Sequence, residues 1–471
     1  MSIVIALDEG TTNAKAVAID GDGRVLAHAS RGLGIRNTAP GWTEQDALEI
    51  REASVEVLAR VLAQVPADEV IGLAISNQRE SVVAWDPVTG TPAGPVLSWQ
   101  DTRTADRCAA LAQVHGDRVL DLTGLPLDPM FSAPKMAWLL EQAPDGTVVG
   151  TVDSWLVWCL TGGSRHVSEA GNASRTLLMD LATLDWHPEL LGVFGIPREA
   201  LPEIVASNGD LGSTACDGLP AGIPILALMA DSHAALRGHG GGEPGVVKAT
   251  YGTGSSVMQG TGAQLRRRPG VATTLAWLDD RPVYALEGNI RYSGSALDWT
   301  ARLLGVADAR SLGALAATVD DADGVVLVPA FGGLGAPHWD PTAVGTLTGL
   351  GAGSGPAQVA RAAFDAVAHQ VADVAEAMLA EGEALEAVRA DGGATASELL
   401  MQTQADALGC EVVVVGEADV ALRGVAAVAF AQRGIALPAA AASRTHRPSY
   451  SAQEREAARA RWRAALDRSK A

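Results

Sequence analysis

The same local pattern occurs twice in this chain of 471 residues, and the repeat constrains the fold more than any other feature. In each copy, an apolar run that is typical of a strand enters a turn rich in glycine and threonine, and a second apolar run returns from it. The copies lie in residues 3–19 and 246–258, and their turns are Gly10-Thr11-Thr12 and Gly252-Thr253-Gly254. The sequence therefore predicts two related halves.

Strand-like and helix-like segments alternate after both copies. Residues 45–65 carry apolar residues at helical spacing, and residues 70–76 return to a strand that we expect to be parallel to the first. A strand over 387–390, the turn Asp391-Gly392-Gly393 and a helix over 397–408 have the form of a strand that feeds a ligand-binding turn. This alternation predicts an α/β fold.

The densest cluster of glycines marks a boundary between the two halves. It runs from Gly238 to Gly245, and we expect an N-terminal lobe over residues 1–243 and a C-terminal lobe over 244–471. The tail from Gln453 to Lys470 is rich in alanine and arginine and predicts a solvated surface helix.

Composition excludes several classes of function. The net charge is −20, and no basic run is longer than Arg266–Arg268, so we expect no binding to nucleic acid. No apolar stretch approaches the roughly 20 residues of a membrane span, and the first residues form no basic and apolar leader. Four cysteines that are far apart favour a reducing compartment and no structural zinc site. We therefore expect a cytoplasmic protein that does not contact membranes.

Backbone N–H groups and hydroxyls in the two glycine–threonine turns can surround phosphate oxygens. One such turn alone could be an ordinary tight turn. Two turns at equivalent places favour a pair of loops that enclose a phosphate-bearing ligand from both halves. The sequence holds no G-x-x-x-x-G-K-[ST] motif, and Asp391-Gly392-Gly393-Ala394 does not complete a G-x-G-x-x-G motif. A P-loop is therefore not the means of binding, and the incomplete fingerprint argues against a dinucleotide site.

Segments along nearly the whole chain resemble, in the same order, the FGGY family of carbohydrate kinases, and its glycerol kinases most of all. The matching runs are Ile5–Thr12, Ser76–Glu80, Ser98–Asp101, Asn172–Thr176, Thr250–Gly254, Gly335–Trp339 and Asp391–Ala394, with longer patterns at Met130–Gln142 and Gly345–Asp365. The resemblance implies a two-lobed, actin-like ATPase (ribonuclease H-like) fold with a duplicated domain. Its lobes would close on ATP and on a sugar or polyol.

The resemblance also implies the roles of two carboxylates. Asp231, which follows the strand-like run 223–230, matches the catalytic carboxylate that acts as general base on the acceptor hydroxyl. Without the resemblance, this aspartate could equally cap the helix that follows it. Asp8 matches the carboxylate that holds Mg²⁺ through water.

The remaining site residues are implied in the same way. Lys15 stands where the family usually has arginine. The positive charge is therefore kept, but the paired N–H donors with which a guanidinium binds a phosphate are lost. Arg79 and Glu80 match the pair that binds vicinal hydroxyls, and Trp99 matches an apolar wall, although a buried Arg–Glu pair can also be purely structural. The implied ATP-binding residues are Thr11, Thr12, Asn13, Lys15, Gly252, Thr253, Gly294, Asp298, Gly392, Gly393 and Ser397, and the implied acceptor-binding residues are Arg79, Glu80, Trp99, Met130, Asp231 and Ser232.

Three positions of the acceptor pocket depart from the glycerol kinase pattern. Met130 replaces a tyrosine, Ser232 replaces a glutamine, and Ser256 replaces a phenylalanine. Loss of two aromatic rings and gain of a small hydroxyl residue should make the pocket wider and more polar. We therefore expect an acceptor longer than glycerol, such as a polyol or ketose of four or five carbons.

The sequence thus predicts an ATP- and Mg²⁺-dependent kinase that phosphorylates a terminal hydroxyl of a small polyol or ketose. The alternatives are glycerol kinase proper, a xylulose or ribulose kinase, and a nucleotide-gated binding protein of the same fold. ADP release that depends on an acceptor would separate the kinases from the binding protein. Many members of the family dimerise or tetramerise, so a homodimer or homotetramer agrees with the resemblance.

Overall fold

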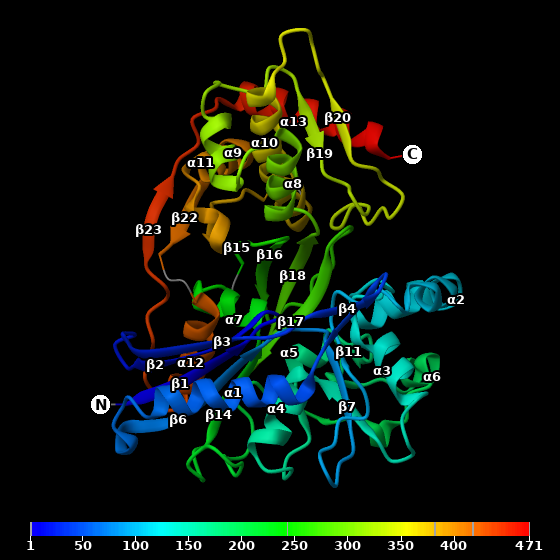
Figure 1. Ribbon diagram of the computed structural model, residues 1–471, viewed down its shortest axis with the longest axis vertical. Coiled ribbons are helices and arrows are strands. Elements are labelled where there is room, and N and C mark those ends of the chain that lie inside the picture. The colour runs from blue at the N-terminus through cyan, green and yellow to red at the C-terminus, as the bar shows by residue number, and fades with distance from the viewer. Residues whose placement is uncertain (1, 243, 381–382, 417–418, 471) are drawn as a thin grey trace.

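The computed structural model describes residues 2–242, 244–380, 383–416 and 419–470. Two lobes lie one above the other (Figure 1), and each contains a sheet that begins with an antiparallel meander. The strand order is β14-β6-β1-β2-β3 in the N-terminal sheet and β17-β18-β16-β15-β21-β22-β23 in the C-terminal sheet. The predicted α/β fold with two related halves is confirmed.

The N-terminal sheet combines an antiparallel meander with two parallel strands. The meander comprises β1 (Ile3–Glu9), β2 (Asn13–Asp20) and β3 (Val25–Gly32). The strands β6 (Val70–Asn77) and β14 (Ile225–Ala230) run parallel to β1 and to each other. The predicted parallel strand after the first helix is therefore confirmed.

The C-terminal sheet repeats this plan. Its meander comprises β15 (Val246–Tyr251), β16 (Ser255–Gly262), β18 (Pro282–Ile290) and β17 (Ala272–Leu278). Next to β15 lie the parallel strands β21 (Ala387–Asp391) and β22 (Glu411–Val415), and β23 (Ala442–His446) closes the edge in the antiparallel sense. The repeat found in the sequence is thus a repeat of sheet topology.

Alternation of side chains along β1 explains why every residue near its centre is apolar. Ile3, Ile5 and Leu7 pack in one buried cluster with α1 (Ala47–Leu62) and α4 (Val152–Leu160). Val4 and Ala6 point to the opposite face and pack with α12 (Val420–Ala431). The strand is therefore buried on both faces.

The other elements complete the two lobes. A second five-stranded sheet, in the order β4-β5-β8-β7-β9, comprises β4 (Arg36–Ala39), β5 (Trp42–Gln45), β8 (Val96–Leu97), β7 (Val82–Trp85) and β9 (Val148–Thr151). Three short pairs are β10 (Val167–Glu169) with β13 (Glu203–Val205), β11 (Met179–Asp180) with β12 (Asp185–Trp186), and β19 (Val326–Val328) with β20 (Thr346–Thr348). The other α-helices are α2 (Ala105–Thr123), α3 (Ser132–Leu140), α5 (Ala170–Ala173), α6 (Pro188–Phe194), α7 (Asp231–Gly238), α8 (Gly294–Leu304), α9 (Ala309–Ala316), α10 (Pro356–Met378), α11 (Glu398–Leu408) and α13 (Ala452–Ser469). No helix within the described ranges combines the length and the apolar character needed to cross a bilayer.

The C-terminal helix differs from its prediction. The prediction of a solvated surface helix is wrong for one face of α13, because Trp462 is buried in the C-terminal core. Its indole N–H donates to Asp373 at 2.7 Å, and Arg459 on the same helix donates to Asp373 and to Glu376 of α10. One aromatic residue and one buried ion-pair network therefore dock this highly charged helix.

The two halves meet where α7 crosses α12. A Cβ on Gly424 of α12 would lie 1.8 Å from the carbonyl oxygen of Ala234, and a Cβ on Gly238 of α7 would lie 2.3 Å from that of Val420. The two backbones can approach this closely only because both residues lack side chains. The lobe boundary stays a prediction, and Glu243, the last residue that it assigns to the N-terminal lobe, lies outside the described residues.

We expect Gly424→Ala to lower the free energy of unfolding by about 1–3 kcal/mol, because the added methyl group overlaps a backbone carbonyl. Gly192→Ala in α6 is the matched control, since its Cβ would meet no atom within 4 Å. The control should leave stability unchanged or raise it slightly. Urea denaturation of both variants measures the difference, and equal midpoints would contradict the close crossing.

Candidate active site

The parallel strands of the N-terminal sheet bring three chain segments to one edge. Glu9 of β1 pairs with Asn77 of β6, which also pairs with Ala230 of β14. Asp8 lies at the end of the first strand, Arg79 and Glu80 follow the second, and Asp231 follows the third. Topology alone therefore gathers the residues predicted for catalysis, metal binding and acceptor binding.

Four buried charges form a balanced cluster at this edge. Arg79 donates two hydrogen bonds to the carboxylate of Glu287, at 2.8 and 2.6 Å. Arg175 donates through Nε to Glu80 at 2.7 Å and lies 3.0 Å from Glu287. All four side chains are at most 7% exposed. Two cations and two anions thus compensate one another.

Glu287 holds the cluster together. Burial would raise the pKa of its carboxyl group, but Arg175 and Arg79 hold that pKa well below its ordinary value. Glu287 belongs to β18 in the C-terminal sheet, whereas both arginines belong to the N-terminal half. The ion pairs therefore also join the two halves of the chain.

Asp231 is a fifth charge beside this cluster. Its carboxylate lies 3.3 Å from Nε of Arg79, and its side chain keeps 40% of its surface exposed. Burial of the group raises the pKa of Asp231 above its usual 3.8, although Arg79 opposes the shift. The carboxylate is therefore more basic than an ordinary aspartate and remains accessible to a ligand.

Glu80 adopts a backbone conformation that is uncommon for a residue with a side chain. Its φ is +60°, which costs on the order of 1–2 kcal/mol outside glycine. Arg175 fixes its carboxylate, and the hydroxyl of Ser132 donates to its backbone carbonyl at 3.1 Å. The surrounding contacts thus hold Glu80 at one position beside Asp231.

Asp8 has the chemistry of a ligand for a hard cation. Ser76 donates a hydrogen bond to one of its oxygens at 2.8 Å. Burial, followed by repulsion from Asp231, raises the pKa of Asp8 to about 6. Two neighbouring carboxylates that are costly to ionise together suit a divalent cation with oxygen ligands.

The first glycine–threonine turn contacts the predicted wall of the acceptor pocket. The indole N–H of Trp99 donates to the hydroxyl of Thr11 at 2.9 Å, and Trp99 is 37% exposed. Asn13 donates to the hydroxyl of Thr12 at 2.9 Å. Lys15 forms an ion pair of 2.7 Å with Asp419, a residue of the C-terminal half, so its charge is already partnered.

The predicted nucleotide-binding residues of the C-terminal half gather at the corresponding edge of the second sheet. Thr250 of β15 pairs with Asp391 of β21, so the turns after both strands emerge side by side. Gly294 donates its N–H to the carbonyl of Gly252 at 3.0 Å, and a Cβ on Gly392 would lie 2.4 Å from the carbonyl oxygen of Tyr251. The close packing explains the glycines at these turns.

Further nucleotide-binding candidates lie on the helices that follow these turns. Backbone N–H groups of Ser293 and Ser295 both donate to the carbonyl of Thr253 at 3.0 Å. Asp298 is exposed one turn into α8. The Ser397 hydroxyl accepts from the N–H of Leu400 and caps α11, and Gly393 faces open space.

Lys135 anchors the loop that carries Met130. Its ammonium group is buried and donates to the carbonyls of Pro129, Met130 and Phe131. Burial lowers the pKa of Lys135 to about 8. Three carbonyl acceptors satisfy every donor of the group and fix the loop beside Glu80.

Two important residues have no assigned role in the sequence analysis. Glu287 was missed, although a glutamate that directly follows the apolar run 283–286 was a signal of a buried charge. Arg175 lies within a matching motif, but its link to two glutamates far away in the chain could be seen only in the fold.

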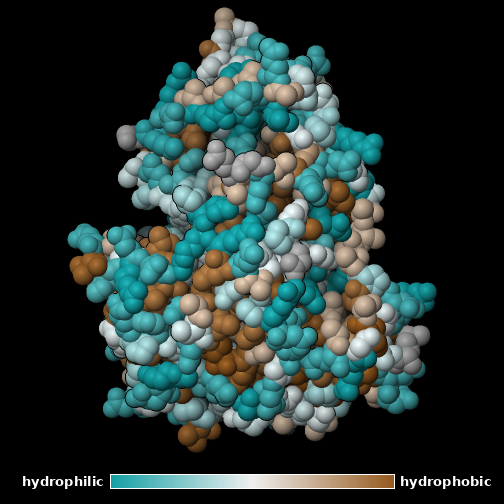
Figure 2. All heavy atoms as spheres, turned by 180° about the vertical axis from the view of Figure 1, so that it is seen from behind, coloured by the Kyte–Doolittle hydropathy of each residue, from teal (hydrophilic) through white to brown (hydrophobic). Residues whose placement is uncertain are grey.

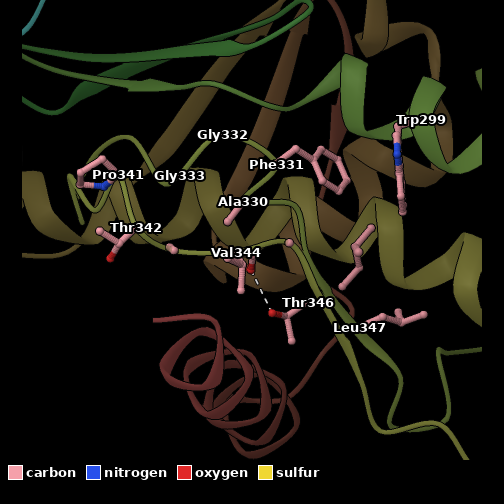
Figure 3. A pocket seen from close by; sticks show the side chains of 13 residues that line it. Trp299, Ala330, Phe331, Gly332, Gly333, Pro341, Thr342, Val344, Thr346 and Leu347 are labelled. Carbon is pink, nitrogen blue, oxygen red and sulfur yellow. Dashed lines mark hydrogen bonds between the residues drawn. The ribbon is translucent and has the colours of Figure 1, made fainter. Parts of the chain in front are cut away.

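The outline of the molecule is indented between the lobes (Figure 2). A separate cavity of about 540 Å³ lies in the C-terminal lobe (Figure 3). It is lined by Trp299, Phe331, Pro341, Val344 and Leu347, among others, and no lining residue is titratable. That cavity offers neither a base nor a metal ligand, whereas the edge of the sheet that holds Asp231 offers two carboxylates.

Comparison with known proteins agrees with this geometry. Residues 3–238 match the profile described as "FGGY family of carbohydrate kinases, N-terminal domain", and residues 247–433 match the C-terminal domain of that family. The chain is 41% identical to a glycerol kinase of Alkalilimnicola ehrlichii, over 99% of this chain and 98% of that protein. It is 44% identical to an apulose kinase of Pectobacterium atrosepticum, over 90% and 88% respectively.

Solved structures agree as well. A crystal structure of Plasmodium falciparum glycerol kinase with ADP is similar to this chain with a TM-score of 0.93 and 26% identity, over 100% of this chain and 98% of that one. Gluconate kinase from Lactobacillus acidophilus, at 21% identity and a TM-score of 0.90 over 99% and 97%, shares the fold.

We expect Glu287→Gln to destabilise the protein by about 3–5 kcal/mol, because Arg79 and Arg175 would lose the buried anion between them. Glu189→Gln is the control, since Glu189 pairs with Arg118 at the surface and its side chain is 45% exposed. Thermal denaturation should show a much larger loss for the buried position. A Glu287→Gln variant as stable as the control would contradict the structural role of the cluster.

Proposed function

The chain belongs to the FGGY family of carbohydrate kinases, and from this premise we propose that it transfers the γ-phosphoryl group of ATP to a terminal hydroxyl of a polyol or ketose longer than glycerol. The observation that carries the proposal is the accessible carboxylate of Asp231, held 3.3 Å from Arg79 beside a neutral cluster of buried ion pairs. Residues 1–243 would supply acceptor binding and the base, and residues 244–471 would supply most of the nucleotide site.

Asp231 acts as general base in this proposal. Phosphoryl transfer asks the protein to align the acceptor with the γ-phosphate and to remove a proton from the attacking hydroxyl. The raised pKa of Asp231 makes its carboxylate a better proton acceptor than an exposed aspartate. Arg79 and the backbone N–H of Ser232 both contact Oδ1 of Asp231, so Oδ2 remains available to the acceptor hydroxyl.

The nucleotide is held between the two glycine–threonine turns. A crystal structure with ADP among the similar proteins supports ATP as the phosphoryl donor. A Cβ on Gly392 would lie 2.4 Å from the backbone carbonyl oxygen of Tyr251, so this glycine lets the turns proposed to hold the nucleotide lie side by side. The residues proposed to contact ATP are Thr11, Thr12, Asn13, Lys15, Gly252, Thr253, Gly294, Asp298, Gly392, Gly393 and Ser397.

Asp8 would hold Mg²⁺, with water completing the coordination, as a cation with a strongly held hydration shell prefers. The ion would supply positive charge for the phosphate oxygens. Asp8 fits this role because burial and Asp231 both disfavour its negative charge when no cation is present. Ser76 keeps one carboxylate oxygen oriented by its hydrogen bond.

The acceptor lies between Trp99 and the charged cluster. The exposed ring face of Trp99 packs on the carbon chain, and its N–H is held by Thr11. Arg79 and Glu80 bind vicinal hydroxyls, while Met130 and Ser232 complete the pocket. Because Met130, Ser232 and Ser256 stand where a glycerol pocket has larger side chains, the site accommodates four or five carbons.

Glycerol is the second candidate acceptor. The chain is 41% identical to proteins named glycerol kinase, and its identity to the protein named apulose kinase is similar. Sequence identity alone therefore does not distinguish glycerol from a longer acceptor, and our choice rests on the residues of the pocket. A cytoplasmic location and assembly as a homodimer or homotetramer stay predictions.

We expect Asp231→Asn to lower kcat by about 10²- to 10⁴-fold, because the amide cannot take the acceptor proton. The Kd for ATP, measured by calorimetry, should change little. In wild type, kcat should fall with decreasing pH as Asp231 is protonated, at a higher pH than for an ordinary aspartate because its pKa is raised. An Asp231→Asn variant that keeps a tenth of the wild-type kcat would contradict the assignment.

Acceptor choice is tested by ADP release with ATP, Mg²⁺ and a panel of three- to five-carbon polyols and ketoses. We expect the highest kcat/KM for an acceptor of four or five carbons, because the three substitutions widen the pocket. A large preference for glycerol would overturn the proposed acceptor class and leave the kinase activity standing.

A further inference from the structure

A row of polar side chains continues from the charged cluster toward solvent. Glu287 and Asn289 are two residues apart on β18, so they share one face of the C-terminal sheet, and Arg291 directly follows the end of this strand. Glu287 is fully buried, Asn289 is half-buried, and the side chain of Arg291 is 42% exposed. Exposure to solvent therefore increases along these three residues, away from the ion pairs beside Asp231.

Asn289, in the middle of this row, lies beside Ser256 of the neighbouring strand, and neither side chain forms a hydrogen bond within the described residues. Ser256 of β16 stands directly opposite Asn289 of β18, so their side chains are neighbours on this face. The Ser256 hydroxyl is buried and has no hydrogen-bond partner, and the Asn289 amide makes no side-chain hydrogen bond within the described part of the chain. A buried hydroxyl normally has a hydrogen-bond partner, so the Ser256 hydroxyl can form a hydrogen bond with a ligand. The half-buried amide of Asn289 can form a second one.

Arg291 reaches the loop that carries Met130. One of its terminal nitrogens lies 3.5 Å from the carboxylate of Asp128, whose other oxygen accepts the backbone N–H of Met130 at 2.9 Å. Its other terminal nitrogen donates to the carbonyl of Gly332 at 3.0 Å. A long and exposed ion pair contributes little stability. The guanidinium can therefore exchange this contact for an oxygen of a ligand.

We propose that Ser256, Asn289 and Arg291 form a distal subsite that binds the hydroxyl or carbonyl oxygens of a four- or five-carbon polyol or ketose, at the end remote from the phosphorylated carbon. The inference rests on the proposed function, since it places the reacting hydroxyl at Asp231. Asn289 lies about 7 Å beyond Glu287 along the strand, away from the ion pairs that flank Asp231. Glycerol would leave these groups unsatisfied, whereas a longer acceptor would reach them.

The test compares Arg291→Ala and Asn289→Ala with wild type on the same acceptor panel. For the best five-carbon acceptor relative to glycerol, the ratio of kcat/KM values should fall at least tenfold in Arg291→Ala, because a charge-assisted hydrogen bond is lost. The loss in Asn289→Ala should be severalfold. Arg302→Ala is the matched control, because Arg302 is an exposed arginine on α8 of the same lobe. Its ratio should stay within twofold of wild type.

Calorimetric titration of the same acceptors without nucleotide separates the subsite from the proposed function. Weaker binding of five-carbon acceptors in Arg291→Ala supports the subsite even if the wild type shows no ADP release, a result that would overturn the function alone. Equal affinity and an unchanged ratio overturn the subsite and leave the kinase standing. Thermal denaturation checks that each variant folds, and Arg291→Ala at the exposed end of the row carries the test if Asn289→Ala does not fold.

Discussion

Glu287 stands between two buried arginines, and the geometry of the site depends on that interaction. Without it, Arg79 and Arg175 would be two like charges in a space that excludes water, where an uncompensated charge costs several kcal/mol. With it, the cluster is neutral, and Arg79 still presents Nε to Asp231. Burial raises the pKa of Asp231, and Arg79, which opposes that rise, is itself anchored by ion pairs that lie one layer deeper.

Sheet topology explains why so few elements are needed to build the site. Strands β1, β6 and β14 are parallel, so the residues after their carboxyl ends meet without any long loop. The repeat of this plan in the second lobe places another set of turns at the ends of β15 and β21. Because Glu287 extends from the second sheet to arginines of the first half, the ion pairs also fix how the two edges face each other.

The sequence was most informative where chemistry depends on local pattern. The glycine–threonine turns, the strand that precedes Asp231 and the parallel strand β6 were predicted from short segments, and their structure is confirmed. Glu287 could not be assigned because its partner Arg79 lies 208 residues away, and nothing local identifies such a pair. The buried face of α13 was missed for a similar reason, since Trp462 interrupts a helix whose composition is that of a solvated surface.

One contact links the two ligands of the proposed reaction. The ring of Trp99 is proposed to form the wall of the acceptor pocket, and its N–H is held by the hydroxyl of Thr11 in the turn proposed to face the phosphates. Because a Thr hydroxyl can both accept and donate, Thr11 can hold Trp99 and still donate to a phosphate oxygen. Any shift of the turn on nucleotide binding would therefore move the acceptor wall with it. In the proposed site, the position of the acceptor would then depend on whether the nucleotide is bound.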